Sequence, residues 1–393
     1  MHKNRSEVLR YLADLLEQHR TNIIDANQSD ISTVKEEDPA LIDRLKVDDK
    51  KVDEMKMALL NTAMQDDPDG EVLYEYTNSE GLFFRNVTVP FGTILIIYES
   101  RPDVTIEATA MAFKSGNKII LKGGKEARNT NLYLVNLWKD ALTKFGYDNE
   151  IVKYLDYTRR EIQEFISSKN EVIDLIIPRG GDALIQFVLQ HSVAPVIVSG
   201  RGNNFVYVHS TADKQMAVNV IVNGKSRISV CNATDKVLID KNIADIKGFV
   251  YSILERLHHM GIKVYGDKSL IGFSDKLMID ADEAVMYEEF LSPKILLSIA
   301  ENVDDAILKI NKYSGGHSAT IITMDKEIAQ RFMNETDCAA VYHNASTRFT
   351  DGGQVGFGGE MAISTQKLHF RGPVGMAQLV TNKWMIYGNG HTR

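Results

Sequence analysis

Short apolar segments alternate with amphipathic helical segments through most of the chain, and this alternation is the feature that most restricts the fold. From Gly92 onward, the segments TILIIYE, KIILKGG and EVIDLIIP are mainly apolar, and the segments between them have helical spacing. Continuous apolar runs are typical of parallel strands that are buried on both faces. The sequence therefore predicts an α/β protein with parallel sheets.

The alternation falls into two sets, which we interpret as two α/β domains. The first set ends with the helix GDALIQFVLQH and the strands PVIVS and NFVYVH, and it predicts one doubly wound nucleotide-binding domain. The second set begins after Thr211. Its predicted elements are helices at 212–224, 243–260 and 303–312 and the strands KVLID, KILLSIA and TIITM. A length of 393 residues favours two or three domains.

The two ends of the chain follow other patterns. Residues 6–26 and 50–64 carry apolar side chains at helical spacing, which predicts a mostly helical N-terminal region. The segment GEVLYEYTNSEGLFFRNVTVP alternates and has a polar turn at residues 78–81, which predicts a hairpin. The C-terminal KWMIYGNG is predicted as a strand. Because a lone hairpin is marginal in water, we expect this hairpin to pack on something else.

Composition restricts the classes of function. The 45 basic and 53 acidic residues give a net charge of −8, which argues against a nucleic-acid partner. No segment approaches the ~18 apolar residues of a membrane span and no signal-peptide pattern occurs, so we expect a cytoplasmic protein with no membrane partner. The two cysteines are far apart and the histidines are adjacent or isolated, so neither a disulfide nor a metal site is expected.

Cys231 lies among small and polar residues in NGKSRISVCNATDKVL. Lys225 and Arg227 precede it and a helical pattern follows it, so nearby cations and a helix amino terminus would lower its thiol pKa and favour a nucleophile. A free cysteine is more often a small buried side chain, and the local residues leave both interpretations open. Cys338 leads into an apolar strand in ETDCAAVYHN, which predicts burial.

Two glycine-containing segments follow predicted strands. In IIPRGGDAL, residues 179–181 lead into a helix whose free amides can bind a phosphate group, and a plain glycine turn is the alternative. In KIILKGGKEA, Lys122 follows a buried strand at the edge where open α/β sheets bind ligands, and a solvated surface lysine is the alternative. The fingerprint G-x-G-x-x-G is absent, and we interpret Gly200-Arg201-Gly202 as a turn.

Several long motifs resemble the gamma-glutamyl phosphate reductase family of the aldehyde dehydrogenase superfamily. They are IYESRPDVTIEATAMAFKSGN, KGGKEA, IPRGG, SGGHSATIIT and VYHNASTRFTDGGQVGFGGEMAISTQKLHFRGP. The resemblance runs from about residue 5 to the C-terminus. It implies a Rossmann-type NADP-binding domain (1–70, 91–208 and 343–371), an α/β catalytic domain (209–342) and a small β oligomerisation element (71–90 and 372–393). The strands of that element would find their missing partners across the interface of a homodimer or homotetramer.

The resemblance also implies a reaction in proline biosynthesis. Cys231 would attack the carbonyl of L-glutamyl 5-phosphate, phosphate would leave, and hydride from NADPH would reduce the thioester to L-glutamate 5-semialdehyde, which cyclises to pyrroline-5-carboxylate. No metal is required, and glutamate 5-kinase, which makes the substrate, is an expected partner. Two alternatives are a superfamily enzyme that oxidises another small aldehyde and a catalytically silent partner subunit.

The resemblance assigns roles to three sets of residues. The catalytic set is Cys231, Arg101 and Asn232. The Cys231 amide and a side chain of the loop Glu99-Ser100-Arg101 are the expected oxyanion donors. The cofactor set consists of Lys122 on the adenosine ribose, Arg179, Gly180 and Gly181 on the pyrophosphate, and Glu289 on the nicotinamide ribose. The residues expected to bind the substrate carboxylate and phosphate are Lys225, Arg227, Ser346, Thr347 and Arg348.

The chain departs from this family pattern next to the nucleophile. NGKSRISVCN stands where the family usually has a segment close to K-T-Q-R-P, and it is one residue shorter before the cysteine. Asn204 and Phe205 stand where cysteine and histidine are frequent, and FLSPKILL replaces a Y-L-D-L run after the glutamate. These departures concern substrate detail and cofactor preference more than the class of reaction.

Overall fold

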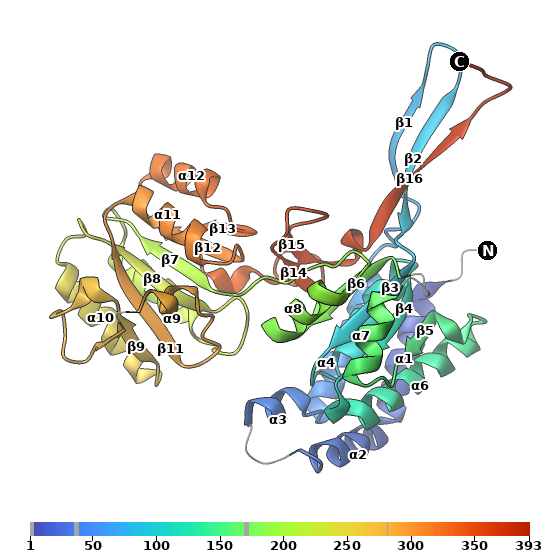
Figure 1. The fold of residues 1–393 in the computed structure, drawn as a ribbon, viewed down its shortest axis with the longest axis horizontal. Coiled ribbons are helices and arrows are strands. Elements are labelled where there is room, and N and C mark those ends of the chain that lie inside the picture. The colour runs from blue at the N-terminus through green and yellow to red at the C-terminus, as the bar shows by residue number, and fades with distance from the viewer. Residues whose placement is uncertain (1–3, 35–38, 169–172, 281) are drawn as a thin grey trace. The chain divides into compact units, whose positions relative to one another are not determined.

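The computed structural model describes residues 4–34, 39–168, 173–280 and 282–393, and the chain forms two compact units. The first unit consists of Met1–Val198, Gly356–Ala362 and Val374–Arg393, and the second of Ser199–Val355 and Ile363–Pro373. Each unit has its own parallel sheet, and helices pack on it (Figure 1). The α/β class with parallel sheets is confirmed.

The sheet of the first unit has four parallel strands in the order β5-β4-β3-β6. Its elements are β3 (Thr93–Tyr98), α5 (Val104–Lys114), β4 (Lys118–Lys122), α6 (Arg128–Lys144), β5 (Val152–Tyr154), α7 (Arg159–Ser167), β6 (Leu175–Arg179) and α8 (Asp182–His191). The predicted strand EVIDLIIP corresponds to β6, and its first two residues lie outside the described ranges. From β3, the next two strands lie on one side and β6 lies on the other. Ligands of such sheets bind at this reversal, outside the carboxyl ends of the strands.

Four helices form the N-terminal region, as predicted. They are α1 (Arg5–Gln18), α2 (Arg20–Ile31), α3 (Pro39–Leu45) and α4 (Asp49–Met64). The helical segment expected over 6–26 is interrupted at His19, whose backbone leaves the helical conformation with φ −103° and ψ 14°. Val8 and Leu12 of α1 are completely buried, and so are Val52 and Met55 of α4, so the apolar stripes that predicted these helices form their packed faces.

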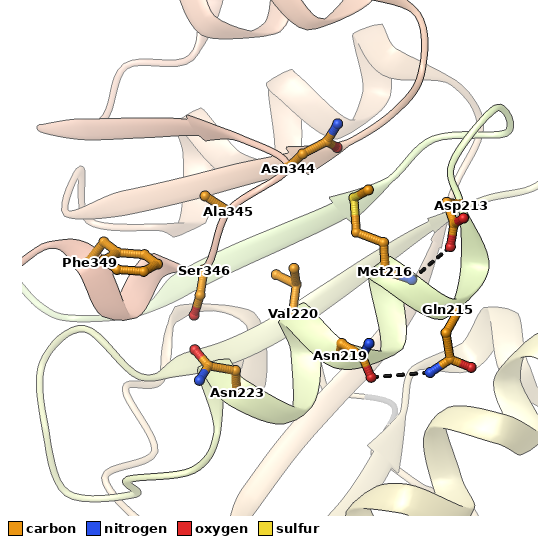
Figure 2. A pocket seen from close by; sticks show the side chains of 10 residues that line it. All are labelled: Asp213, Gln215, Met216, Asn219, Val220, Asn223, Asn344, Ala345, Ser346 and Phe349. Carbon is orange, nitrogen blue, oxygen red and sulfur yellow. Dashed lines mark hydrogen bonds between the residues drawn. The ribbon is translucent and has the colours of Figure 1, made fainter.

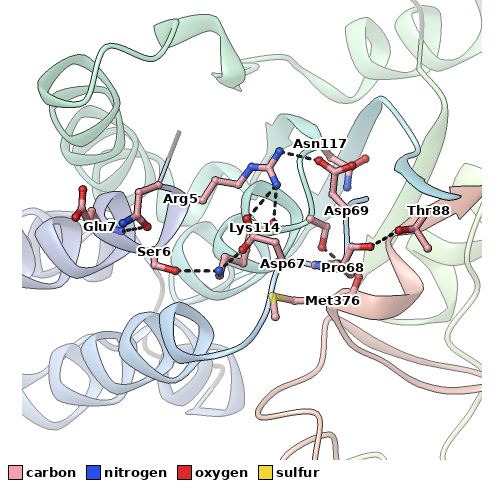
Figure 3. A network of polar contacts seen from close by, with 12 residues as sticks. Arg5, Ser6, Glu7, Asp67, Pro68, Asp69, Thr88, Lys114, Asn117 and Met376 are labelled. Atoms are coloured by element: carbon pink, nitrogen blue, oxygen red, sulfur yellow. Dashed lines mark hydrogen bonds and ion pairs between the residues drawn. The ribbon is translucent and has the colours of Figure 1, made fainter. Parts of the chain in front are cut away.

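A network of ion pairs fastens the start of the chain to the end of α5 (Figure 3). The Arg5 guanidinium donates to Asp67 at 3.2 Å and to Asp69 at 3.0 Å. The buried Lys114 ammonium bonds Asp67 as well, and it donates to the Ser6 hydroxyl at 2.9 Å. A Cβ atom on Gly116 would lie 2.7 Å from a Pro90 ring carbon, and its φ of +84° also favours glycine.

A three-stranded antiparallel sheet contains the predicted hairpin and the C-terminal strand. The hairpin is β1 (Val72–Thr77) and β2 (Phe83–Pro90), and β16 (Val380–Tyr387) pairs with the other edge of β2. The C-terminal strand therefore has its partner in the same chain, which corrects the expectation that this partner lies across a subunit interface. Large apolar side chains on this sheet are half exposed: Val72, Leu73, Tyr74, Tyr76, Trp384, Ile386 and Tyr387.

The second unit has seven parallel strands in the order β10-β9-β11-β8-β7-β12-β13. Its strands are β7 (Asn204–Val208), β8 (Thr234–Asp240), β9 (Lys263–Gly266), β10 (Met278–Ile279), β11 (Lys294–Ala300), β12 (Ser318–Ile322) and β13 (Ala340–His343). Its helices are α9 (Lys214–Gly224), α10 (Ile246–His259), α11 (Val303–Tyr313) and α12 (Lys326–Glu335). On β7, Val206 packs in the cluster that includes α9 and α10, whereas Phe205 and Tyr207 pack in the cluster that includes α11 and α12.

Short elements complete the fold. The strands β14 (Ala362–Ser364) and β15 (Gly372–Val374) pair with each other. The 3₁₀ helices are η1 (Lys125–Ala127), η2 (Asn149–Ile151), η3 (Lys268–Leu270), η4 (Glu283–Tyr287), η5 (Thr347–Phe349) and η6 (Met376–Gln378).

Two predictions about the middle of the chain are wrong. The strand NFVYVH is β7 of the second sheet, so that unit begins at Ser199 rather than at residue 209, and it also retains residues 343–355. PVIVS is not a strand, because Val196 and Ser199 make only isolated bridges. The alternation of strands and helices shows where strands occur, but it does not show which sheet each strand joins.

Candidate active site

Cys231 lies in the segment that enters β8, at the amino edge of the seven-stranded sheet, and it is partly exposed. The chain turns at residues 231–232 and β8 begins at Thr234, so the predicted helix after the cysteine is wrong. The β-branched residues of TDKVLID favour the strand. Cys338 is buried, as predicted, and burial raises the pKa of its thiol to about 11. Cys231 is therefore the more accessible of the two thiols.

The backbone of Cys231 is held in place by Asn204, the first residue of β7, and by Gly202 just before that strand. The Asn204 side-chain amide donates to the Cys231 carbonyl oxygen at 2.7 Å and to the Ala233 carbonyl oxygen at 2.7 Å. A Cβ atom on Gly202 would lie 2.0 Å from the Cys231 carbonyl oxygen, so only glycine allows this close approach. The sequence analysis assigns no role in the site to either residue. The segment GRGNN, in which two asparagines follow two glycines at the start of a buried strand, was a usable signal for one.

Arg348 interacts electrostatically with Cys231, and Arg227 interacts with Arg348. Arg227 is exposed in the segment before Cys231, and Arg348 is half-buried in the segment after β13. Burial lowers the pKa of the Arg348 guanidinium, the like charge of Arg227 acts in the same direction, and the charges of Asp351 and Cys231 oppose them. Two guanidinium groups near one thiol form a site that favours an anionic substrate.

Other predicted residues hold this arrangement together instead of facing solvent. The Asn232 side-chain amide donates to the carbonyl oxygens of Arg348 at 3.2 Å and Thr350 at 2.9 Å, so both of its hydrogens are used. The Thr347 hydroxyl is completely buried and donates to the Asn232 carbonyl oxygen at 2.9 Å. These bonds argue against Asn232 as a catalytic donor and against Thr347 as a substrate ligand, because neither group has a free donor directed at a ligand.

Lys225 is also a buried residue. Its ammonium group has no exposed surface and bonds a carboxylate oxygen of Asp235 at 2.5 Å. The prediction that Lys225 contacts the substrate does not fit this position. Beside it, burial lowers the pKa of the Lys236 ammonium to about 7, although the Asp235 charge acts against that change.

Ser346 lies at a different surface. Together with α9 and the residues that follow β13, it lines an open cavity of about 550 Å³ (Figure 2). Its hydroxyl oxygen accepts a hydrogen bond from the Arg348 backbone N–H at 3.3 Å. Cys231 does not line this cavity. Ser346 is linked to the surroundings of the cysteine by its hydrogen bond with the Arg348 backbone.

The predicted cofactor residues of the first unit gather at the carboxyl edge of its sheet. The loop 99–101 follows β3, Lys122 ends β4, and Arg179 ends β6. The Gly181 N–H at the start of α8 donates to the Glu99 carboxylate at 3.1 Å, and α8 has no side-chain cap. The Lys122 ammonium donates to the Gly123 carbonyl oxygen at 2.7 Å, and burial lowers its pKa. Arg101 is exposed in the loop after β3.

Glu289 belongs to the second unit, in the loop between β10 and β11, and it is partly exposed. The four other predicted cofactor residues belong to the first unit. The chain that the structure describes contains no helix long and apolar enough to cross a bilayer. Within the same ranges, no three His, Cys, Asp or Glu side chains lie close enough together to hold a metal ion.

The chain combines a partly exposed cysteine at the edge of one parallel sheet with a second α/β unit that has its own parallel sheet. Residues 1–268 and 277–384 match the model of the aldehyde dehydrogenase family. A propionaldehyde dehydrogenase from Clostridium phytofermentans, 17% identical, has the same fold with a TM-score of 0.68, and the match covers 97% of this chain and 92% of that one.

Relatives with higher sequence identity show which branch of this family the chain belongs to. The gamma-glutamyl phosphate reductase of Thermotoga sp. (strain RQ2) is 41% identical over 395 residues, which cover 100% of this chain and 94% of the relative. The crystal structure of gamma-glutamyl phosphate reductase from Thermotoga maritima, 40% identical, matches with a TM-score of 0.93 over 100% of this chain and 95% of that one. The chain belongs to the aldehyde dehydrogenase family and, within it, to the gamma-glutamyl phosphate reductases.

Proposed function

We propose that this protein catalyses the NADPH-dependent reduction of L-glutamyl 5-phosphate to L-glutamate 5-semialdehyde in proline biosynthesis. The observation that carries the proposal is the partly exposed Cys231, which interacts electrostatically with Arg348, which in turn interacts with Arg227. The names of the full-length relatives support the same reaction. An acyl phosphate supplies an electrophilic carbonyl for the thiol and anionic groups for the two arginines.

In the proposed reaction, the Cys231 sulfur bonds to the acyl carbon and the bond from that carbon to the phosphate oxygen breaks. Phosphate leaves with the electron pair, and a thioester remains on the enzyme. Reduction of the thioester carbonyl then releases the aldehyde and restores the thiolate. This order divides one difficult reduction into two easier steps, because a thiolate is both a good nucleophile and a good leaving group.

Arg227 and Arg348 are the proposed ligands of the substrate anions, with Ser346 supporting Arg348 through its backbone. The tetrahedral intermediate carries an oxyanion that needs donors in fixed positions. We assign the Cys231 backbone amide and Arg101 to this role. The bonds from Asn204 to the Cys231 and Ala233 carbonyl oxygens keep the cysteine backbone in place for it.

NADP(H) fits the residues present at the carboxyl edge of the four-stranded sheet. At the start of α8, which has no side-chain cap, a pyrophosphate oxygen would replace the Glu99 carboxylate oxygen that accepts a hydrogen bond from the Gly181 N–H. Lys122, Arg179, Gly180 and Gly181 would hold the adenosine and pyrophosphate parts, and Glu289 the nicotinamide ribose. The bound cofactor would supply the hydride.

We extend the proposal to the oligomeric state, the cellular location and the partner of the protein. The half-exposed apolar residues of the sheet β1-β2-β16 support a homodimer or homotetramer in which another copy covers them. We also propose a cytoplasmic location and an association with glutamate 5-kinase, because an acyl phosphate is short-lived in water.

The test is the reverse reaction. The purified protein should reduce NADP continuously with glutamate semialdehyde only when inorganic phosphate is present, because phosphate must release the acyl group from Cys231 before the next turnover. The Cys231→Ala variant should be folded and inactive. Phosphate-independent oxidation would indicate hydrolysis of the thioester and an aldehyde dehydrogenase of another kind, and it would contradict the proposal.

A further inference from the structure

Two side chains of β8 form hydrogen bonds with the backbone of the loop that carries Glu289, one on each side of that residue. The Lys236 ammonium donates to the Glu288 carbonyl oxygen at 2.7 Å. The Phe290 N–H donates to a carboxylate oxygen of Asp235 at 2.7 Å. These two backbone groups belong to the peptide units immediately before and after Glu289, so two neighbouring side chains fix the direction in which Glu289 leaves the backbone.

An irregular strand pairing places both side chains against one loop. In the register of β7 with β8, Asn204 lies opposite Thr234 and Phe205 lies opposite Lys236, which leaves Asp235 as an extra residue. Consecutive strand residues ordinarily point to opposite faces, and a bulge of this kind redirects a side chain. Asp235 and Lys236 therefore reach the same loop although they are adjacent in sequence.

The side chains that hold this loop are buried charged groups. The exposed fractions of Lys225, Asp235 and Lys236 are 0%, 2% and 1%, and the second Asp235 oxygen accepts from the Lys225 ammonium. The Lys236 ammonium also lies 3.6 Å from the centre of the Phe290 ring and donates to the Asn203 side-chain oxygen. Buried charges are costly unless they are paired and hydrogen-bonded, so removing one member of this network leaves another buried without its partner.

We propose that Asp235 and Lys236 are positioning residues that fix Glu289 for the nicotinamide ribose, and that Lys225 extends the same network to the segment leading to Cys231. The proposal rests on the cofactor role proposed above for Glu289. Lys225 is the first residue after α9 and begins the segment 225–230, so the Asp235 carboxylate joins the approach to the nucleophile with the loop of the ribose ligand.

The experiment compares Lys236→Met with Lys294→Met in the full-length protein. Lys294 lies over the same Phe290 ring at 4.4 Å, but its ammonium pairs with the Glu288 side chain and not with the loop backbone. We expect Lys236→Met to raise both the Kd of NADP, measured by fluorescence titration, and its KM by about tenfold, with a smaller change in kcat. Lys294→Met should change each value by less than about twofold.

A double-mutant cycle with Glu289→Ala separates positioning from general stability. If Lys236 acts through Glu289, the Kd of NADP for the double variant should equal that of Glu289→Ala alone. Independent, additive effects of the two substitutions would overturn the proposal, as would an unchanged Kd in Lys236→Met. Asp235→Asn, which keeps the shape of the side chain, gives the same cycle if Lys236→Met does not fold.

The cycle also distinguishes failure of the inference from failure of the proposed function. If Glu289→Ala leaves the Kd of NADP unchanged, the cofactor role of Glu289 is wrong and the inference fails with it. If Glu289→Ala raises the Kd and the Asp235 and Lys236 variants do not, the cofactor role stands and only the positioning role is wrong.

Discussion

The two parallel sheets carry their candidate site residues at opposite edges of their own strands. In the four-stranded sheet, Lys122 and the turn 179–181 follow the strands, at the carboxyl edge where such sheets bind ligands. In the seven-stranded sheet, Cys231 and Glu289 lie in segments that enter strands, at the amino edge. A search for function restricted to carboxyl edges would find Lys122 and the turn 179–181 and would miss Cys231.

The two edges also differ in the chemical groups they contain and in how deeply these groups are buried. The carboxyl edge offers the Gly181 amide at an uncapped helix start and the half-buried Lys122. The amino edge rests on buried polar side chains, among them Asn204, Thr347 and Asp235, whose partners are backbone groups of neighbouring segments. The difference indicates that the first edge is suited to bind and release a ligand and the second to hold reacting groups in fixed positions.

The largest expected effect comes from removing the nucleophile at the amino edge. Cys231→Ala should lower the phosphate-dependent reduction of NADP on the order of 10⁴-fold or more, because the thioester route is lost. Cys338→Ala is the matched control, since that thiol is buried and its raised pKa keeps it protonated. Comparable losses in the two variants would contradict the distinction between the two cysteines.

A smaller but substantial effect is expected at the support beneath Cys231. In Gly202→Ala, the new Cβ would meet the Cys231 carbonyl oxygen at 2.0 Å, so the cysteine backbone must shift. A displacement of this kind costs about 100-fold in kcat when it misplaces a reacting group. Gly359→Ala, where a Cβ meets nothing within 4 Å, provides the control and should keep full activity.

At the carboxyl edge, the expected change is in binding. Lys122→Met should raise the KM for NADP by about tenfold with little change in kcat, because the lost contact is made equally in the ground and transition states. The control is Lys118→Met, an exposed lysine at the other end of β4. A fall in kcat with an unchanged KM would show that this edge does more than bind the cofactor.

The smallest effect concerns stability at the amino edge. His317, which precedes β12, is completely buried, and burial lowers its pKa from 6.5 to about 4. Between these values the unfolded state binds more protons, so the free energy of unfolding falls as the pH drops from 6.5 towards 4, by about 3 kcal/mol in total. Urea unfolding of His317→Asn across this range should show a shallower decline than the wild-type protein, and equal slopes would contradict the assignment.

Much of the fold follows from the sequence, because buried strands and amphipathic helices have recognisable periods. TILIIYE, KILLSIA and the hairpin with its turn at residues 78–81 became β3, β11 and the pair β1-β2. The boundary between the two units was predicted at the wrong residue because β7 has the same apolar pattern as the strands before it. Long-range pairing decides which sheet such a strand joins. The helix after Cys231 was predicted wrongly for the same reason, since a short segment with β-branched residues takes its conformation from the sheet it joins.

The site was only partly predictable. Cys231 and Arg227 stand out in the polar segment 223–238, and Arg348 lies in a motif of the family resemblance. Asp235 and Lys236 gave no comparable signal, because a polar residue in a strand is ordinarily exposed and only the structure shows that these are buried. The family resemblance assigns Lys225 to substrate binding, whereas in the structure it forms a buried ion pair with Asp235.

The most direct test of the central claim is a single-turnover experiment without phosphate. With NADP and glutamate semialdehyde but no phosphate, the account predicts a burst of NADPH no larger than the number of active sites. It also predicts a glutamyl group on the peptide that contains Cys231, detected by mass spectrometry and released when phosphate is added. Continuous turnover without phosphate, or an acyl group on any other residue, would contradict the assignment of Cys231 as the thioester-forming nucleophile.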